Sequence, residues 1–181
     1  MAHTFKRTGT LRAGYNPEQV DAFLARAKRA YSGDSSEDIT EKTVRSCAFG
    51  WVRNGYDPYL VDAALDRLEA AFVQRRRAKI MDEHGEKRWL EETYAQAQTL
   101  YPRLLRPAGE RFADASDTGY SKNEVDALLS KIAAYFDAEA ELTSEDIRHA
   151  TFSAARGAKA YDEAVVDVFL DRAVSVLLSV E

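Results

Sequence analysis

The sequence predicts an all-α protein made of two pairs of similar helical modules joined by a linker helix. Three observations predict this: one eleven-residue motif occurs four times, each occurrence begins like a helix N-terminus, and apolar residues follow at helical spacing. The four copies occupy residues 14–24, 55–65, 119–129 and 160–170. Positions 14 and 55 are 41 residues apart, and so are positions 119 and 160. The chain is therefore a duplication of a duplication.

The third position of each copy carries a residue that favours a helix N-cap. Its side-chain oxygen accepts a hydrogen bond from a backbone amide that otherwise has no partner. These residues are Asn16, Asp57, Ser121 and Asp162. Pro17 and Pro58 follow at the first helical position, where a missing amide hydrogen costs nothing. Ser121 with Glu124 is typical of a capping box, and Asn16 with Gln19 of a weaker one.

A tyrosine and a valine flank each predicted helix start, in the positions of a hydrophobic staple. The pairs are Tyr15 with Val20, Tyr56 with Val61, Tyr120 with Val125, and Tyr161 with Val166. Apolar residues continue at four, seven and eleven positions from each valine, which predicts one broad stripe per helix, buried against another helix. We therefore expect these tyrosines and valines to be structural.

An aspartate follows each valine and lies off the apolar stripe. The four are Asp21, Asp62, Asp126 and Asp167. Because they fall in the first helical turn, we expect them to complement the positive end of the helix dipole rather than to bind a ligand.

A phenylalanine precedes each tyrosine by seven to ten positions. The four are Phe5, Phe49, Phe112 and Phe152. In the second and fourth copies the phenylalanine closes a short amphipathic segment, residues 40–49 and 143–152, which predicts a short helix. Each pair thus has the order loop, helix, short helix, loop, helix.

We divide the chain into residues 1–78 for the first pair, 79–111 for a linker helix, and 112–181 for the second pair. Residues 78–106 have helical periodicity, with a break expected around Gly85. The net charge is +3 for residues 1–78, zero for the linker and −8 for residues 112–181. Such asymmetry suits head-to-tail association, or one half facing an anionic surface.

No uncharged apolar run is long enough to span a membrane, so we expect a cytoplasmic protein. Its single cysteine, Cys47, is expected to fill space in the core. His3, His84 and His149 are isolated from other metal-ligating residues, and phosphate-loop and nucleophile motifs are absent from the sequence. We expect no enzymatic activity, no cofactor and no metal.

Residues 142–152, followed by 160–172, resemble the N-terminal domain of DivIVA, a bacterial cell-division and polar-growth scaffold. The other copies and the connecting segment at residues 106–112 resemble actinobacterial proteins built from repeated DivIVA domains, so the resemblance covers nearly the whole chain. It implies that each pair is a single-chain version of the parallel DivIVA dimer, in which two helices form a coiled coil and crossed loops touch the membrane at the tip.

The membrane-contacting Phe-Arg step of DivIVA is not retained here. The matching dipeptides are Arg12-Ala13, Arg53-Asn54, Asp117-Thr118 and Ala158-Lys159. No copy has the phenylalanine, and only Lys159 keeps a base in the second position. Trp51, beside Val52 and Arg53, is a substitute suited to an anionic bilayer, although burial of the Trp51 ring is an equally good interpretation.

The leading hypothesis is a non-catalytic scaffold or adaptor that binds other proteins of bacterial cell division or envelope growth and self-associates. The alternative is a peripheral membrane module at the inner face of the cell membrane, acting through loop tips. Its candidate residues are Leu11, Arg12, Trp51, Arg53, Arg156 and Lys159. A remote alternative is nucleic-acid binding through Arg75, Arg76 and Arg77, for which a solvated helix face is the favoured interpretation.

Overall fold

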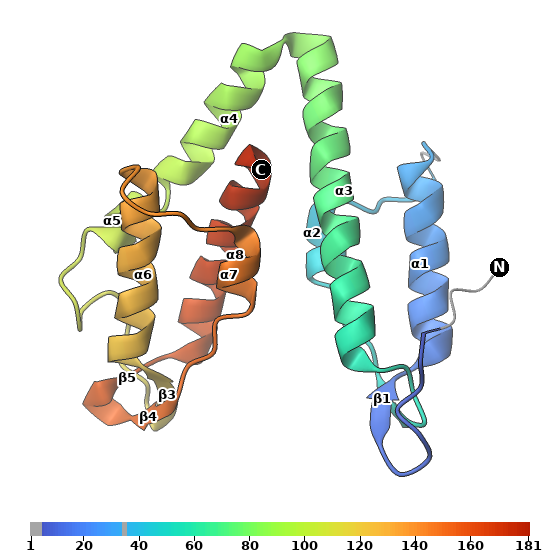
Figure 1. Ribbon diagram of the computed structural model, residues 1–181, viewed down its shortest axis with the longest axis horizontal. Helices are drawn as coiled ribbons and strands as arrows, with labels where there is room; N and C mark the ends of the chain where they lie inside the picture. Colours follow the sequence, from blue (N-terminus) through green and yellow to red (C-terminus); the bar gives the residue numbers. More distant parts are fainter. Residues whose placement is uncertain (1–4, 34–35) are drawn as a thin grey trace. The chain divides into compact units, whose positions relative to one another are not determined.

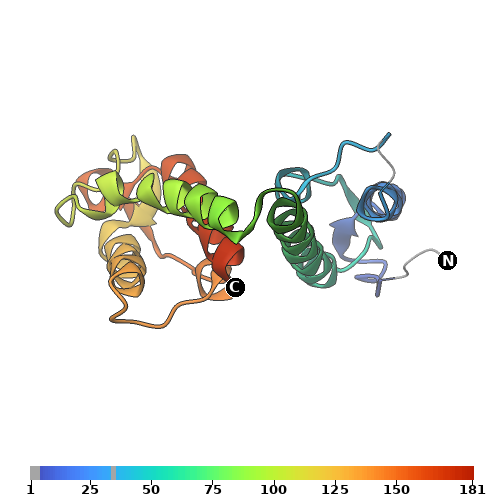
Figure 2. The same ribbon diagram turned by 90° about the horizontal axis from the view of Figure 1, so that it is seen from above.

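The computed structural model describes residues 5–33 and 36–181 and is mostly helical (Figure 1). This confirms the predicted helical class, with short strands added where loops were expected. The chain divides into two compact units, Met1–Lys79 (unit 1) and Ile80–Glu181 (unit 2). Figure 2 shows the same ribbon diagram from above.

Unit 1 contains one pair of repeat copies. Its elements are β1 (Ala13–Tyr15), α1 (Pro17–Tyr31), α2 (Glu41–Arg45), β2 (Trp51–Arg53) and most of α3 (Pro58–His84). The backbone amides of Tyr15 and Tyr56 each donate to the carbonyl of the other residue, at 3.0 and 2.8 Å, so α1 and α3 begin side by side. Val20 shares a buried cluster with Val61 near these helix starts. The paired helices therefore run parallel, as Figure 1 shows.

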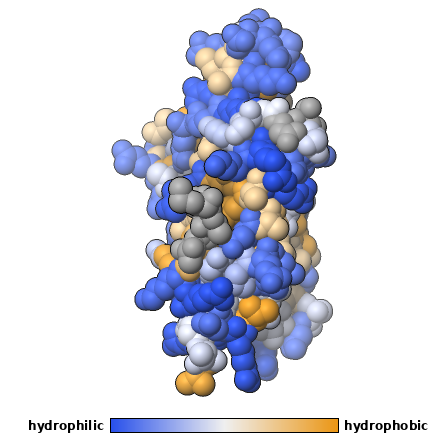
Figure 3. Space-filling model, turned by 90° about the vertical axis from the view of Figure 1, so that its right-hand side faces the viewer, coloured by the Kyte–Doolittle hydropathy of each residue, from blue (hydrophilic) through white to orange (hydrophobic). Residues whose placement is uncertain are grey.

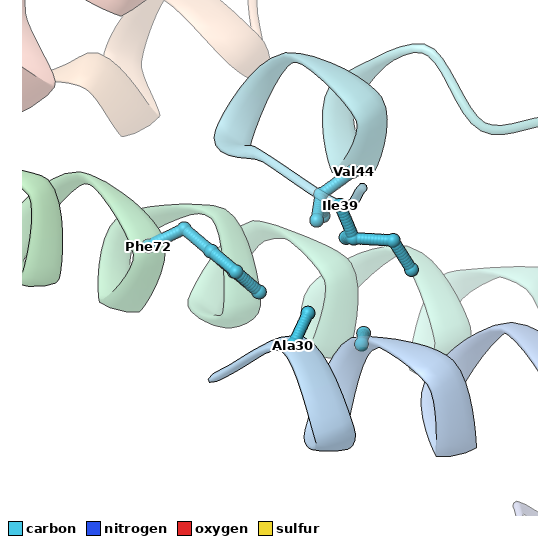
Figure 4. Close-up of a cluster of buried hydrophobic side chains, with 5 residues drawn as sticks. Ala30, Ile39, Val44 and Phe72 are labelled. Carbon is cyan, nitrogen blue, oxygen red and sulfur yellow. The ribbon is translucent and has the colours of Figure 1, made fainter. Parts of the chain in front are cut away.

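Three helices build the far end of the unit 1 core. Ala30 comes from α1, Val44 from α2 and Phe72 from α3, while Ile39 precedes α2, and all four side chains converge (Figure 4). Helix α2 is the predicted short helix. Thr40 and Thr43 form a capping box at its start, a local signal beyond the amphipathic pattern that predicts this helix.

Unit 2 contains the second pair. Its elements after α3 are α4 (Glu86–Gln98), α5 (Tyr101–Leu104), β3 (Thr118–Ser121), α6 (Lys122–Phe136), α7 (Ser144–Arg148), β4 (Ala154–Arg156), the 3₁₀ turn η1 (Gly157–Lys159), β5 (Ala160–Tyr161) and α8 (Glu163–Val180). The three strands form an antiparallel sheet in the order β4-β3-β5. Helix α7 packs against α8. The predicted stripe of α6 is fully buried at Val125, Leu129 and Ile132.

The segment expected to be a separate linker contributes to the core of unit 2. Its predicted break is confirmed, because α3 ends at His84 and α4 begins after Gly85. Helix α4 packs against α8. The indole of Trp89 is only 2% exposed and its Nε1 donates to the Ser179 carbonyl at 3.2 Å. Burial of this ring ties α4 to unit 2.

Three of the four predicted N-caps are confirmed. The side chains of Asn16, Asp57 and Asp162 accept from backbone amides two or three residues further along. Ser121 makes no such bond, so its expected capping box with Glu124 is wrong.

Glu124 and Gln19 instead reach the other copy of their own pair. Glu124 accepts from the backbone amide of Ser153 at 2.5 Å, and Gln19 accepts from that of Gly50 at 2.7 Å. The equivalent residue in each unit thus ties the start of its first long helix to the loop of the second copy.

The basic run on α3 makes contacts inside unit 1. Arg75 donates to the carbonyls of Ala30 and Tyr31 at the end of α1, and its guanidinium lies 5.4 Å from the Tyr31 ring centre. Arg76 forms an ion pair with Glu41 at 3.0 Å. Arg75 is exposed, as a solvated helix face predicts, and Arg76 is half-buried, but both also bind groups of their own unit.

Candidate functional site: the joints and loop tips of the two units

Each unit is closed by a joint in which the two copies exchange hydrogen bonds. In unit 1 the Tyr56 hydroxyl donates to the carboxylate of Asp21 at 3.0 and 3.2 Å. In return, the Tyr15 hydroxyl donates to Asp62 at 3.5 Å. The tyrosine of each copy therefore binds the aspartate of the other copy.

Unit 2 repeats this arrangement. The Tyr161 hydroxyl donates to Asp126 at 3.1 and 3.2 Å, and Tyr120 hydrogen bonds to Asp167. The Asp126 carboxylate also accepts from the Gly109 amide at 2.7 Å. The sequence predicts only a helix-dipole role for these aspartates, and the structure adds their tyrosine partners. The available signal was that all four copies carry Asp, whereas a dipole interaction accepts Glu equally well.

The repeated phenylalanines also pack on the tyrosine of the other copy. The ring pairs, with centroid distances, are Phe5–Tyr56 at 5.4 Å, Phe49–Tyr15 at 5.6 Å, Phe112–Tyr161 at 5.3 Å and Phe152–Tyr120 at 5.1 Å. Such tilted contacts suit aromatic quadrupoles. In each joint the two copies therefore exchange ring contacts as well as hydrogen bonds.

Burial raises the pKa of all four joint tyrosines, and their aspartate partners raise the pKa further. Burial also raises the pKa of the Asp62 carboxyl, with Asp66 adding to the shift and the Tyr15 hydrogen bond opposing it. The tyrosines therefore stay protonated donors at neutral pH. Their role in the joint is to hold two copies together.

The joint brings the two backbones so close that glycine is required. A Cβ on Gly14 would lie 2.3 Å from the Tyr56 carbonyl oxygen, and one on Gly119 would lie 2.0 Å from the Tyr161 carbonyl oxygen. These contacts are with backbone, which cannot move aside easily. Close packing thus explains the glycines that precede Tyr15 and Tyr120.

Four candidate residues meet at the tip of unit 1. Strand β1 pairs antiparallel with β2, so Ala13 faces Arg53 and Tyr15 faces Trp51. Trp51 and Arg53 lie on the same side of β2, since alternate residues share a side. Leu11 and Arg12 lie in the turn that leads into β1.

The unit 1 tip is apolar and basic at once. Leu11 is 98% exposed and Trp51 is 62% exposed, although the Trp51 ring lies 5.1 Å from that of Tyr15. Residues 5–16 and 49–56 carry four basic side chains and no acidic one. In Figure 3, groups of hydrophobic residues appear among hydrophilic ones on the face shown. The interpretation of Trp51 as a buried residue is therefore wrong.

The tip of unit 2 has a different character. Arg156 pairs with Thr118 in the β3–β4 ladder and Lys159 ends the 3₁₀ turn, and both side chains are exposed. Asp114 and Asp117 balance these two charges within residues 112–121 and 152–161. Within the described chain, no exposed large apolar residue lies in either of these segments. The six candidate residues are thus divided between two unlike tips.

The described residues contain no group of three or more metal-ligating side chains, and none of their helices meets the length and apolarity needed to cross a bilayer. His3 lies outside them. His149 lies 3.3 Å from Glu145, one turn earlier on the same segment. Cys47 is half-buried, and burial raises the pKa of its thiol to about 11, so the thiol stays protonated.

Comparison of the chain with protein-family models, curated proteins and solved structures finds no match.

Proposed function

We propose that this chain is a non-catalytic helical scaffold or adaptor of the DivIVA-repeat type, which binds other proteins of bacterial cell division or envelope growth. The observation that supports this is the exchanged tyrosine–aspartate pairing, seen at Tyr56–Asp21 and Tyr161–Asp126. It joins two parallel copies inside one chain, which is the arrangement implied by the resemblance to a DivIVA dimer.

Covalent linkage of the copies has a consequence for binding. Each copy is already tethered to its partner, so the core forms without a second chain and independently of protein concentration. The tyrosines and aspartates that pair the copies already bind one another in the joints. The outer faces of the helices therefore remain for docking. Opposite net charges on the two halves, +3 for residues 1–78 and −8 for residues 112–181, favour different partners for each.

The test is in-cell crosslinking followed by affinity purification and mass spectrometry in the native bacterium. We expect division or envelope-growth proteins to be enriched with the unaltered chain. The variant compared with it is Gly14→Ala, which disrupts the unit 1 joint. This variant should lose the partners of unit 1 and keep those of unit 2. Enrichment of no such protein, with and without crosslinker, would contradict the proposal.

A second candidate function is peripheral binding to anionic membranes through the unit 1 tip. The observation that favours it is the exposure of Leu11 and Trp51 among four basic side chains. An exposed aromatic ring with neighbouring positive charge suits the interface of an anionic bilayer. The tip of unit 2 lacks this combination, so only unit 1 carries the second candidate.

Vesicle co-sedimentation tests the membrane candidate. Pelleting with anionic vesicles, but not with neutral ones, is expected to fall with salt and to be lost in Trp51→Ala. Tyr94→Ala is the matched control, because Tyr94 is also an exposed aromatic residue (65%) but lies on α4 in unit 2. Equal pelleting of both variants, or none by the unaltered chain, eliminates this candidate.

Nucleic-acid binding through residues 75–77 is the least supported function. Arg75 and Arg76 already contact their own unit, so two of the three guanidiniums are occupied by the fold.

A further inference from the structure

A single residue, Gly85, separates two helices that otherwise follow one another directly. Helix α3 ends at His84 and α4 begins at Glu86. Gly85 has φ +82° and ψ 163°, a backbone conformation that is essentially restricted to glycine. The backbone conformation of Gly85 alone therefore separates α3 from α4.

No tertiary packing imposes this conformation. A Cβ built on Gly85 meets nothing within 4 Å, and residues 82–88 are all exposed. The hydrogen bonds of the break are local ones, from the Gly85 amide to the Met81 carbonyl at 3.0 Å and from the Arg88 amide to the Gly85 carbonyl at 3.2 Å. No side chain caps the start of α4. The break thus depends on the chain near Gly85 and not on either core.

A single continuous helix over α3 and α4 is the alternative to the helices broken at Gly85. Glu83, Glu86 and Lys87 are good helix formers. If Gly85 took helical dihedrals, residues 58–98 would form one helix, and the uncapped amides of the first turn of α4 would gain intrahelical acceptors. Glycine is the residue that least favours this outcome, because it loses the most conformational freedom in a helix.

We propose that Gly85 is a hinge at which the chain exchanges between a broken and a continuous helix, so that two rigid units change their relative orientation. The hinge determines how far apart the surfaces of the two units lie when each is occupied. It is independent of which partner or surface either unit binds.

Double electron–electron resonance on the full chain tests the hinge. Spin labels at Ala22 on α1 and Ala127 on α6, both exposed, report the inter-unit distance in a Cys47→Ala background. Labels at Ala22 and Arg67, both exposed in unit 1, report a distance within one unit. We expect a broad inter-unit distribution and a narrow intra-unit one.

Gly85→Ala is expected to narrow the inter-unit distribution to one distance. Alanine disfavours positive φ and favours the helix, and the two effects together lower the population of the broken form on the order of tenfold or more. Helical circular dichroism should rise slightly.

Gly9→Ala is the matched control. Gly9 has φ +89° and no atom within 4 Å of a built Cβ, but it lies in a loop of unit 1. This variant suffers similar strain and should keep the broad distribution. The hinge is refuted by an inter-unit distribution of the unaltered chain as narrow as the intra-unit one, by Gly85→Ala remaining broad, or by Gly9→Ala narrowing equally.

Discussion

The hydroxyl of Tyr56 donates to the carboxylate of Asp21, although the two residues belong to different copies of the repeat. Tyr161 and Asp126 have the same relationship in unit 2. Because each copy supplies both a donor and an acceptor, the same two residue types recur in all four copies. The exchanged pairing thus explains why tyrosine and aspartate recur at the same two positions of every copy, although an isolated helix needs neither.

We predict that Tyr161→Phe destabilises unit 2 by about 1–3 kcal/mol, because it leaves the buried Asp126 carboxylate without one of its donors. Tyr15→Phe should cost less, since that hydrogen bond is 3.5 Å long. Urea unfolding followed by tryptophan fluorescence measures both, because Trp51 lies in unit 1 and Trp89 in unit 2. The exposed control Tyr94→Phe should stay within about 0.5 kcal/mol of the unaltered chain. Equal stability of Tyr161→Phe and this control would exclude a stabilising role for the bond.

We also predict loss of stability in alkaline solution. Burial and the aspartate partners raise the pKa of Tyr56 and Tyr161 in the folded state. The folded protein therefore keeps protons that the unfolded chain releases near its ordinary pKa of about 10. This stabilising contribution is complete below about pH 10 and is lost as pH rises through the higher folded pKa.

Urea titrations from about pH 8 to 11, with tyrosinate absorbance recorded in parallel, measure this effect. The double variant Tyr56→Phe/Tyr161→Phe should show a shallower decline, because it lacks two of the shifted groups. A decline as steep as that of the unaltered chain would assign the alkaline loss to other residues.

Local signals in the sequence predicted the long helices well. The caps at Asn16 and Asp162 depend only on neighbours in the chain, and the apolar stripe through Val125 and Leu129 depends only on helical period. Glu124 has the same local context as a capping residue, but its actual partner is the amide of Ser153, 29 positions away. Sequence spacing alone does not separate these two outcomes.

The sequence indicates which residues are candidates for the loop tips, but it does not indicate how strand pairing positions them. Strands of two to four residues, such as Trp51–Arg53, are too short for an alternating pattern to identify. Their pairing places Leu11 and Trp51 in one tip and Arg156 in the other. The exposure of Trp51 depends on how its ring lies against Tyr15, which is a tertiary contact.

We predict that Gly14→Ala destabilises unit 1 by at least about 2 kcal/mol, because the new methyl group would collide with the backbone carbonyl of Tyr56. Gly9→Ala is the control. Gly9 has φ +89° but nothing lies within 4 Å of a built Cβ, so that variant adds backbone strain of about 1 kcal/mol without a collision. Urea unfolding monitored at Trp51 compares the two. Equal losses would mean that backbone conformation, and not close approach, explains the glycine at position 14.

The ion pair between Arg45 on α2 and Glu69 on α3 is a place where the two units differ. The Glu69 side chain is 1% exposed, and Arg45 Nε donates to it at 2.7 Å. Counting from the tyrosine of each copy, the equivalent of Glu69 in unit 2 is Val174, which is also buried. The fold therefore accommodates either a carboxylate or an aliphatic side chain at this position of the second long helix.

We predict that Arg45→Ala destabilises unit 1 by about 3 kcal/mol, because it removes a charge partner from a buried carboxylate. The double variant Arg45→Ala/Glu69→Val should recover most of that loss, since replacing both charges by apolar groups is often neutral or stabilising. Urea unfolding of the two variants and of Glu69→Val alone forms a thermodynamic cycle that isolates their interaction. If the double variant is as unstable as Arg45→Ala, the arginine stabilises unit 1 through its aliphatic packing instead of its charge.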